Sequence, residues 1–229
     1  LYLPFGGGSY GIWANDDVVA NHPRSVADLL KPEWKGRISL TDGQVQPNVA
    51  LALMAMGEAP FAVQDASDDR AKMAEMQKAD GPLQTTLTAL YDQVGFFWSA
   101  GPEFRDDLAF VASYGPGAAA HLANGGNWSI VNFEEGNTVW LDTINFSKKL
   151  EGPKLEAAEI FANYFIGKEV QERIVNGLGM VASSTLVEAN PMLDENPEFF
   201  AEELFWPPYT KVANNVMNML SKRASGTGS

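Results

Sequence analysis

The sequence predicts an α/β fold, and three observations support this prediction. Strand-like and helix-like segments alternate over the first 146 residues, the pattern becomes helical from Pro153 onward, and loops rich in glycine, proline and polar side chains follow several strands. Such alternation is typical of a largely parallel sheet covered by helices. In these sheets, small ligands bind where the strands end at their carboxyl edge.

The first segment contains apolar stretches on both sides of a glycine run. Residues 1–15 read LYLPFGGGSYGIWAN, which we interpret as a strand, a glycine loop and a second strand. We expect the loop to be a turn beside a cleft, where glycine permits positive φ and a close approach of backbone to a ligand. Ser9 and Tyr10 are then candidate hydrogen-bond donors in that cleft.

The next segments carry clear local signals. Ser25 is the predicted N-cap of a short helix that ends before Pro32. Residues 37–41 predict a buried strand, with the turn residues Asp42 and Gly43 directly after it. Residues 47–56 are apolar on nearly all sides, which indicates a buried helix with proline in its first turn.

The remaining elements follow from the same periodicities. A charged amphipathic pattern predicts a surface helix at 68–79, and a run of small residues predicts a short helix at 118–123. The strands expected at 129–133 and 137–146 flank an acidic turn. The expected helices are 68–79, 83–91, a short one ending at residue 108, 118–123, 155–166, 170–178, 197–204 and 212–220, and the expected strands are 94–98, 109–113, 129–133 and 137–146.

Composition excludes several classes of function. The chain has 229 residues, enough for one large domain or two smaller ones, and its net charge of −13 argues against nucleic acid or an anionic membrane as partner. The absence of cysteine excludes disulfides, thiolate metal sites and cysteine nucleophiles, and two histidines far apart make no metal site. We therefore expect no cofactor, no bound metal and no catalytic residue.

One motif points to an enzyme. Gly7-Gly8-Ser9-Tyr10-Gly11 fits the G-x-S-x-G pattern of a hydrolase nucleophile elbow. That elbow is a turn from strand to helix, whereas the residues that follow here have a strand pattern. A serine hydrolase that uses Ser9 stays as an alternative, with His121 as the histidine that follows it in the chain.

Several stretches, in chain order, resemble a known family. They are Leu3-Pro4-Phe5 to Asn15, a helix with Ala27-Asp28-Leu29, the stretch PEWKGRISLTD at 32–42, TVWLD at 138–142, and the two helices within 156–179. The ordered set resembles periplasmic solute-binding proteins of ABC transporters, of the spermidine/putrescine type. The resemblance covers nearly the whole chain and implies a type II periplasmic-binding-protein fold.

The resemblance also implies a division of the chain. Residues 8–140 and 189–223 would form a complete α/β lobe two, and residues 1–7 and 141–188 would be hinge strands and the C-terminal part of lobe one. Most of lobe one would then have no counterpart here, so a missing N-terminal lobe segment is an expected partner. Residues 224–229 are small and polar and predict a disordered tail.

Polyamine binders of this family hold ammonium groups with carboxylates and cover methylenes with aromatic rings, and the match to that pattern is partial. Trp140 and Asp142 fall on a matching aromatic and carboxylate, Ser99 on a ligand-contacting serine, and Tyr114 near a ligand-facing tryptophan. Gly43 and Gln46 stand where further acidic residues are expected, and Met180 stands where an aromatic is expected. The expected ligand-binding residues are Asp142, Trp140, Tyr114, Ser99, Trp98, Ser9, Tyr10, Asp42, Gln44 and Gln46.

The function that this resemblance implies is solute capture for import, without catalysis. The ligand would be a small polar, amine-containing molecule, either a polyamine, an opine or an amino-acid derivative. The expected partners are this solute and the membrane permease of an ABC transporter, in the periplasm or, lipid-anchored, outside a Gram-positive cell. A degenerate binding module without a transport role is a further alternative.

Overall fold

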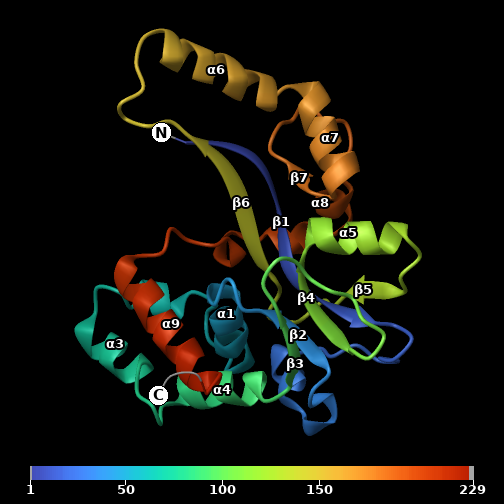
Figure 1. The fold of residues 1–229 in the computed structure, drawn as a ribbon, viewed down its shortest axis with the longest axis vertical. Coiled ribbons are helices and arrows are strands. Elements are labelled where there is room, and N and C mark those ends of the chain that lie inside the picture. Colours follow the sequence, from blue (N-terminus) through green and yellow to red (C-terminus); the bar gives the residue numbers. More distant parts are fainter. Residues whose placement is uncertain (1, 227–229) are drawn as a thin grey trace.

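The computed structural model of the protein describes residues 2–226. Figure 1 shows a large part, with most of the helices, and a small part above it that contains α6, α7 and β7. Within the described residues the strands form one sheet in the order β3-β2-β4-β1-β5, and β6 and β7 also pair with β1. The strands are β1 (Tyr2–Asn15), β2 (Ile38–Thr41), β3 (Val94–Trp98), β4 (Phe110–Tyr114), β5 (Trp128–Ile130), β6 (Thr138–Asn145) and β7 (Val181–Ala182).

The α/β fold class is confirmed, but the sheet is mixed rather than largely parallel. Strand β2 pairs in parallel with both β3 and β4, as alternation with helices predicts. Strand β1 is antiparallel to β4, β5, β6 and β7. The chain therefore contains a parallel core of three strands beside one long strand that runs against its neighbours.

The glycine loop predicted within residues 1–15 is wrong. Residues 2–15 form one continuous strand, and Gly6, Gly7, Gly8 and Gly11 are not among the glycines with positive φ. Close packing explains these glycines instead: a Cβ atom on Gly7 would lie 2.7 Å from the backbone oxygen of Trp140, and one on Gly8 would lie 3.0 Å from the Trp140 ring. Because glycine has no side chain, β6 can lie close against β1 at these positions.

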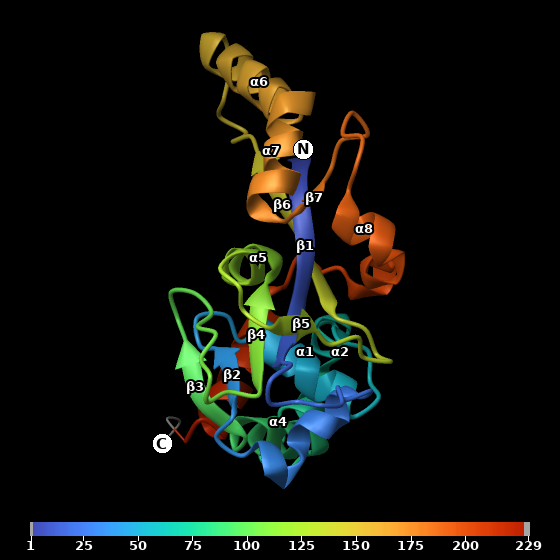
Figure 2. The ribbon, with the colours of Figure 1, turned by 90° about the vertical axis from the view of Figure 1, so that its right-hand side faces the viewer.

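Strand β1 belongs to both parts of the molecule. Its carboxyl half pairs with β4 from Tyr10 to Ala14, and its amino half pairs with β6 from Tyr2 to Tyr10. Figure 2 shows β1 running from the large part up into the small part, with β6 and β7 nearby. Two strands, β1 and β6, thus cross from one part into the other.

The helices have several predicted boundaries within two residues of the observed ones. They are α1 (Gln46–Ala55), α2 (Ala62–Asp65), α3 (Arg70–Met76), α4 (Pro82–Tyr91), α5 (Gly115–Ala123), α6 (Pro153–Phe165), α7 (Lys168–Leu178), α8 (Pro191–Glu195) and α9 (Lys211–Ala224), with 3-10 turns at Val26–Leu30, Pro32–Trp34, Pro197–Phe200 and Glu202–Leu204. The predicted cap is present: the Ser25 side chain accepts a hydrogen bond from the Ala27 N–H at 3.2 Å, and Asp28 reaches back to the Ser25 N–H.

Other local predictions need correction. No helix ends at Leu108, because residues 102–105 have no regular structure and only a turn precedes Leu108. The helix predicted at 118–123 begins three residues earlier, because Gly115, Pro116 and Gly117 form the first turn of α5, where proline lacks the N–H that the helix would leave unpaired. The predicted helix 197–204 is two 3-10 turns, and of the predicted tail, residues 227–229 lie outside the described residues while Ala224 ends α9.

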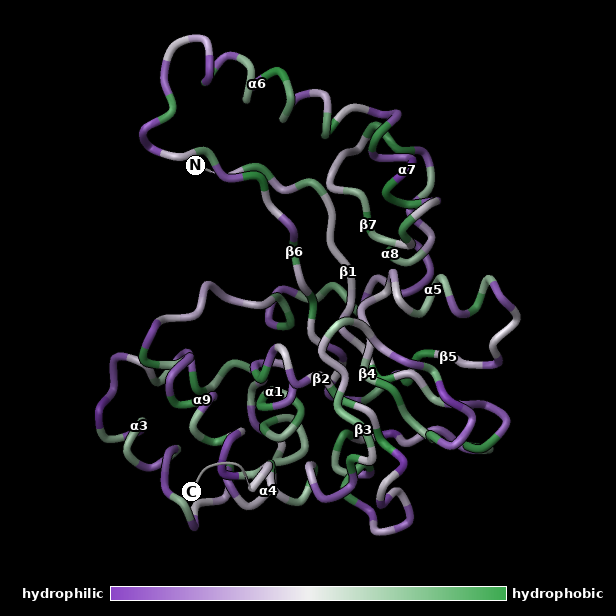
Figure 3. The backbone as a smooth tube through the Cα atoms, viewed as in Figure 1, coloured by the Kyte–Doolittle hydropathy of each residue, from purple (hydrophilic) through white to green (hydrophobic). Residues whose placement is uncertain are grey.

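The hydrophobic core of the large part lies between the sheet and three helices. Its fully buried side chains include Leu53 of α1, Leu87 and Leu90 of α4, and Leu220 of α9. Figure 3 shows apolar segments of these helices and of β2 and β4 in this region. Tyr91 also meets Ser221 at 2.8 Å, so the end of the described chain is bound into the same core as α1 and α4.

The small part is organised around one buried glutamine. Gln171 of α7 is fully buried, and its side chain donates to the backbone oxygens of Phe5 at 2.7 Å and Phe165 at 3.1 Å. Its oxygen accepts from the backbone N–H groups of Ser183 and Ser184. This side chain therefore joins α7 to β1, to the end of α6 and to the segment after β7.

Across the described residues, every helix is too short or too polar to cross a membrane.

Candidate ligand-binding site

A cleft lies at the carboxyl ends of the three parallel strands. Its volume is about 1030 Å³, and most of its lining comes from the loop after β2, the loop after β3, the end of β4 with the start of α5, strand β6, and residues 206–208, with Tyr2 of β1 and Met180 before β7 in addition. The lining residues are Tyr2, Thr41, Gly43, Gln44, Trp98, Ser99, Ala100, Gly101, Pro102, Tyr114, Pro116, Gly117, Trp140, Leu141, Asp142, Thr143, Asn145, Met180, Trp206, Pro207 and Pro208. In sheets with parallel strands, ligands bind at this carboxyl edge.

The structure brings six of the ten predicted site residues into this cleft. These six are Gln44, Trp98, Ser99, Tyr114, Trp140 and Asp142. The side chains come from three strands and two loops that are far apart in the sequence. Strand β6 supplies Trp140 and Asp142, which are two residues apart and therefore point to the same side of the strand.

The other four predicted residues do not line the cleft. Ser9 and Tyr10 are buried at 2% and 3% exposure, and neither hydroxyl has a hydrogen-bond partner among the described residues. Gln46 donates to the Asn214 oxygen at 2.8 Å, and it therefore holds α1 to α9. Asp42 is exposed, and its backbone N–H donates to Trp98.

An aromatic cluster forms one wall of the cleft. We use this name for Tyr10, Trp98, Tyr114, Trp140 and Trp206. The Tyr114 ring lies at the centre, with ring centroids 5.0 Å from Tyr10, 6.0 Å from Trp98, 6.0 Å from Trp140 and 6.2 Å from Trp206. All four contacts are edge-to-face, an arrangement that stabilises aromatic pairs and holds the rings in place.

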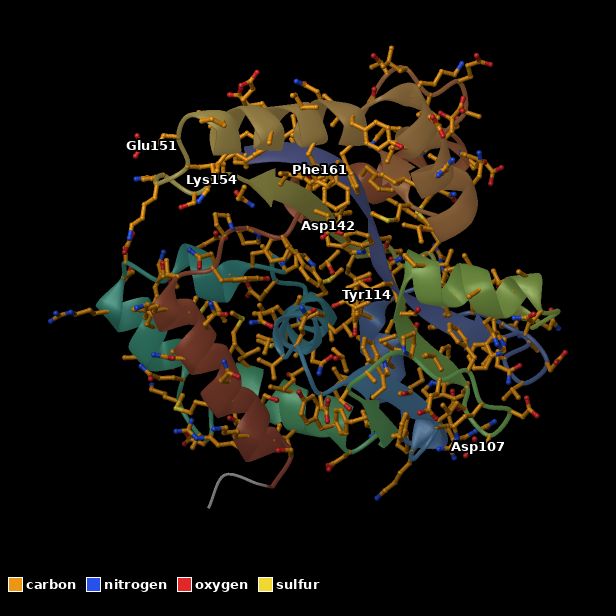
Figure 4. All side chains as sticks on the ribbon, turned by 45° about the horizontal axis from the view of Figure 1, so that its top comes forward. Asp107, Tyr114, Asp142, Glu151, Lys154 and Phe161 are labelled. Carbon is orange, nitrogen blue, oxygen red and sulfur yellow. The ribbon has the colours of Figure 1, made fainter. Side chains whose placement is uncertain are left out.

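Among the described residues, Asp142 is the only one with a charged side chain that lines the cleft. Within the described part of the chain, no hydrogen bond or ion pair reaches its carboxylate. The Asp142 side chain is exposed to solvent on β6, but the surrounding protein partly desolvates its carboxylate, and this raises the pKa of Asp142 above its ordinary value. Figure 4 shows Asp142 and Tyr114 facing the same region, Asp142 from β6 and Tyr114 from the end of β4.

Tyr114 is coupled to the groups around it. Its hydroxyl donates to the Gln44 side-chain oxygen, which links the end of β4 to the loop after β2. Burial, and to a smaller extent the nearby Asp142 charge, raises the pKa of Tyr114 to about 12. Tyr114 is therefore a neutral hydrogen-bond donor at physiological pH.

The geometry does not favour a serine hydrolase. Ser9 lies inside a strand rather than in a turn between strand and helix, and its hydroxyl has no base as partner among the described residues. His22 meets Asp16 at 2.7 Å, and the His121 ring stacks on Phe104 with centroids 4.6 Å apart. In residues 2–226 there is also no group of three or more histidine, aspartate or glutamate side chains that could hold a metal ion.

Three residues that the sequence did not predict also belong to the site. Trp206 completes the aromatic cluster, and Pro207 and Pro208 line the cleft beside it. The backbone N–H of Trp206 donates to the backbone oxygen of Val139 at 2.8 Å, so the segment joins the start of β6. The dipeptide Pro207-Pro208 fixes an extended backbone after the indole. The only local signal was a tryptophan before two prolines in the apolar, aromatic stretch LFWPPY at 204–209, and nothing in the sequence connects it with β6.

Comparison with known proteins gives a family and a set of similar folds. A profile of bacterial extracellular solute-binding proteins matches residues 1–202. No curated protein sequence matches the chain.

Solved structures with low sequence identity share the fold. A spermidine/putrescine ABC transporter substrate-binding protein from Streptococcus pneumoniae, in complex with calcium and HEPES, is 16% identical with a TM-score of 0.73, and the match covers 100% of this chain and 69% of that one. An ABC transporter protein from Clostridium perfringens is 19% identical with a TM-score of 0.64, covering 99% and 69%. The PBP MotA from A. tumefaciens B6, in complex with glucopine, is 15% identical with a TM-score of 0.66, covering 100% and 71%.

Proposed function

The chain belongs to the family of bacterial extracellular solute-binding proteins, and from this premise we propose that it captures a small amine-containing solute in the cleft beside Asp142. The solute would then be delivered to the membrane permease of an ABC transporter, in the periplasm or at the outer surface of the cell. The protein would act by binding alone, without catalysis.

One observation carries this proposal. Asp142 is an unpaired carboxylate in a cleft whose other lining side chains are uncharged, many of them aromatic. A cationic nitrogen would give Asp142 a charge-assisted hydrogen bond or ion pair and would gain cation–π attraction from the rings. The proteins of similar fold support this class of ligand, because their names include spermidine, putrescine and glucopine.

The proposed binding residues are those that line the cleft with Asp142. Trp140, Trp98 and Tyr114 would cover the apolar part of the solute, and Ser99 and Gln44 would offer neutral hydrogen bonds. Trp206 joins this set. Tyr10, as a buried member of the aromatic cluster, would hold Tyr114 in place, and Ser9 would not contact the solute. Asp42 and Gln46 would act only after a rearrangement of the loop after β2.

We also propose that the molecule works as two lobes about the strands β1 and β6. Lobe two would comprise residues 8–140 and 189–223, and residues 1–7 and 141–188 would belong to the hinge and to lobe one. Closure about such crossing strands is a common way to enclose a ligand. The exposed apolar face of α6 would pack against a further α/β segment that completes lobe one.

Calorimetric titration of the protein tests the proposal. Putrescine, spermidine, amino-acid derivatives and opines are titrated into the native chain and into Asp142→Asn, with Asp68→Asn, an exposed surface carboxylate, as the matched control. We expect at least one amine to bind the native chain and the control, with affinity reduced about tenfold or more in Asp142→Asn. Equal affinity in Asp142→Asn, or no binding by any amine, would contradict the proposal.

A further inference from the structure

The chemistry of the cleft wall points to a particular kind of nitrogen. We propose that the site selects a methylated ammonium group, such as a trimethylammonium monocation, over a primary ammonium of the same size. This inference rests on the proposed function, because it concerns the same cleft, and it narrows the class of solute.

The charge of the cleft lining restricts the charge of the solute. The cleft carries one carboxylate, that of Asp142, and none of its lining residues is lysine, arginine or histidine. A solute with one positive charge balances this cleft. A carboxylate on the solute would find no charged partner among the described lining residues, and a second ammonium group would find no second carboxylate there.

The hydrogen-bond acceptors of the cleft lining also bear on the kind of nitrogen that it binds. A primary ammonium has three N–H donors, and each loses a water molecule when the group is buried. The Gln44 oxygen already accepts a hydrogen bond from the Tyr114 hydroxyl, which leaves it one further acceptor position, and the Thr143 hydroxyl oxygen accepts a hydrogen bond from the Asn145 amide at 2.9 Å. For its three donors, a primary ammonium needs acceptors besides Asp142, from uncharged groups such as Ser99 and Gln44, whereas a trimethylammonium group has no N–H donor and needs none.

The wall of the cleft offers aromatic and other apolar surface to the solute. Trp140 and Trp206 both line the cleft, and because an indole has no hydrogen-bond acceptor they add aromatic surface without adding an acceptor. Leu141, Met180 and Pro207 add apolar surface to the lining of the same cleft. Methyl groups bury well on such a wall, and the charge that they carry is attracted by the ring faces, which is how aromatic cages hold quaternary ammonium groups.

A matched pair of probes tests this inference. Choline and ethanolamine differ only in three N-methyl groups, and both are titrated calorimetrically into the native chain, with putrescine, spermidine and an opine as further probes. We expect choline to bind about tenfold tighter than ethanolamine. Ethanolamine or putrescine binding as tightly as choline would overturn the inference.

Two substitutions separate the ring from the charge. Trp140→Leu should reduce the preference for choline over ethanolamine several-fold, and Trp140→Phe, which keeps a ring face, should retain most of it. Asp142→Asn should weaken both probes by a similar factor. Phe161→Leu, an exposed aromatic of α6 that does not line the cleft, is the control. An unchanged preference in Trp140→Leu would also overturn the inference.

The outcomes of these titrations separate a failure of the inference from a failure of the proposed function. If putrescine, spermidine or the opine binds through Asp142 and choline does not, the inference fails while the proposed function stands. If none of the probes binds the native chain, the proposed function fails together with the inference.

Discussion

Asp142 occupies a position where its charge is unfavourable for folding and useful for binding. Partial burial raises its pKa, which means that the folded protein holds a proton on this group more tightly than the unfolded chain does. Stabilisation from such a shift is present below the ordinary carboxyl pKa and is lost as the pH rises through the raised value. At neutral pH the folded protein therefore carries an uncompensated charge.

We predict that Asp142→Asn raises the thermal midpoint at neutral pH while it weakens amine binding. The amide keeps the shape of the side chain and removes the desolvated charge. The difference in midpoint between Asp142→Asn and the native chain should shrink as the pH falls through the raised pKa, because the native carboxyl is then neutral as well. Differential scanning calorimetry between about pH 7 and pH 4 measures this dependence.

Asp68→Asn is the control for this measurement, since it makes the same chemical change at an exposed position outside the cleft. A lower midpoint for Asp142→Asn at neutral pH would show that the carboxylate is stabilising in the folded protein and would contradict the prediction.

Single residues of the site differ in how far the sequence could predict them. Trp140 and Asp142 stand two apart in a strand pattern, so a resemblance to polyamine binders was enough to select them, and the structure places both in the cleft. Their role in binding remains a prediction. Trp206 could not be selected, because its position depends on a backbone hydrogen bond to Val139, which lies 67 positions earlier in the chain, and no local pattern records such a contact.

Among the elements, β1 shows how a local rule can mislead. A glycine run usually indicates a turn, because glycine loses much conformational freedom in a strand and tolerates positive φ. Here the run is required by the neighbours on both sides: Gly6 pairs with Asp142 on β6 and with Ala182 on β7. Whether a glycine serves a turn or a close approach depends on those neighbouring strands, which the sequence of β1 does not contain.

We predict that Gly7→Ala destabilises the protein and that Gly177→Ala, in α7, stabilises it. An alanine Cβ at position 7 would lie 2.7 Å from the backbone oxygen of Trp140, whereas nothing lies within 4 Å of a Cβ at position 177. Overpacking costs about 1–3 kcal/mol, and replacing an exposed helical glycine with alanine gains about 0.4–1 kcal/mol. The thermal midpoints should move down by roughly 2–10 °C and up by roughly 1–4 °C respectively.

Thermal unfolding followed by circular dichroism checks both changes in one experiment, with Gly101→Ala, a loop position that is also open around its Cβ, as a neutral control. If Gly7→Ala unfolds at the native temperature, the close approach of β6 to β1 does not constrain position 7, and the explanation for the glycine run is wrong.

At the scale of the whole molecule, the sequence predicts the composition of the fold better than its connections. Alternating periodicity predicts the parallel strands β2, β3 and β4 and their helices, because each element buries its own apolar face. The antiparallel course of β1 and the return of α9 to the core of the large part depend on contacts between distant segments, such as Gln84 with the backbone of Leu220 at 3.2 Å. Only the resemblance to a family anticipated an arrangement in which strands cross between two parts.

The small part leaves an apolar helix face uncovered, and this leads to the last prediction. Ile160, Phe161 and Tyr164 of α6 are 64%, 55% and 56% exposed, and Ala162 is the one buried residue of that helix. Their spacing places them on one side of the helix. Exposed apolar surface of this kind marks an interaction site, and it is the surface that we propose for the rest of lobe one.

We expect the triple substitution Ile160→Gln, Phe161→Gln and Tyr164→Gln to reduce binding of the dye ANS and self-association in sedimentation velocity, with a thermal midpoint close to that of the native chain. Exposed side chains usually contribute within about 0.5 kcal/mol to the free energy of unfolding, so their loss should leave the fold intact. Glu156→Gln with Glu159→Gln, which alters exposed polar residues of the same helix, is the matched control and should leave dye binding unchanged. A strong fall in the thermal midpoint of the triple variant would mean that these side chains stabilise the fold of this chain itself, and the apolar face would then no longer indicate a surface that another segment covers.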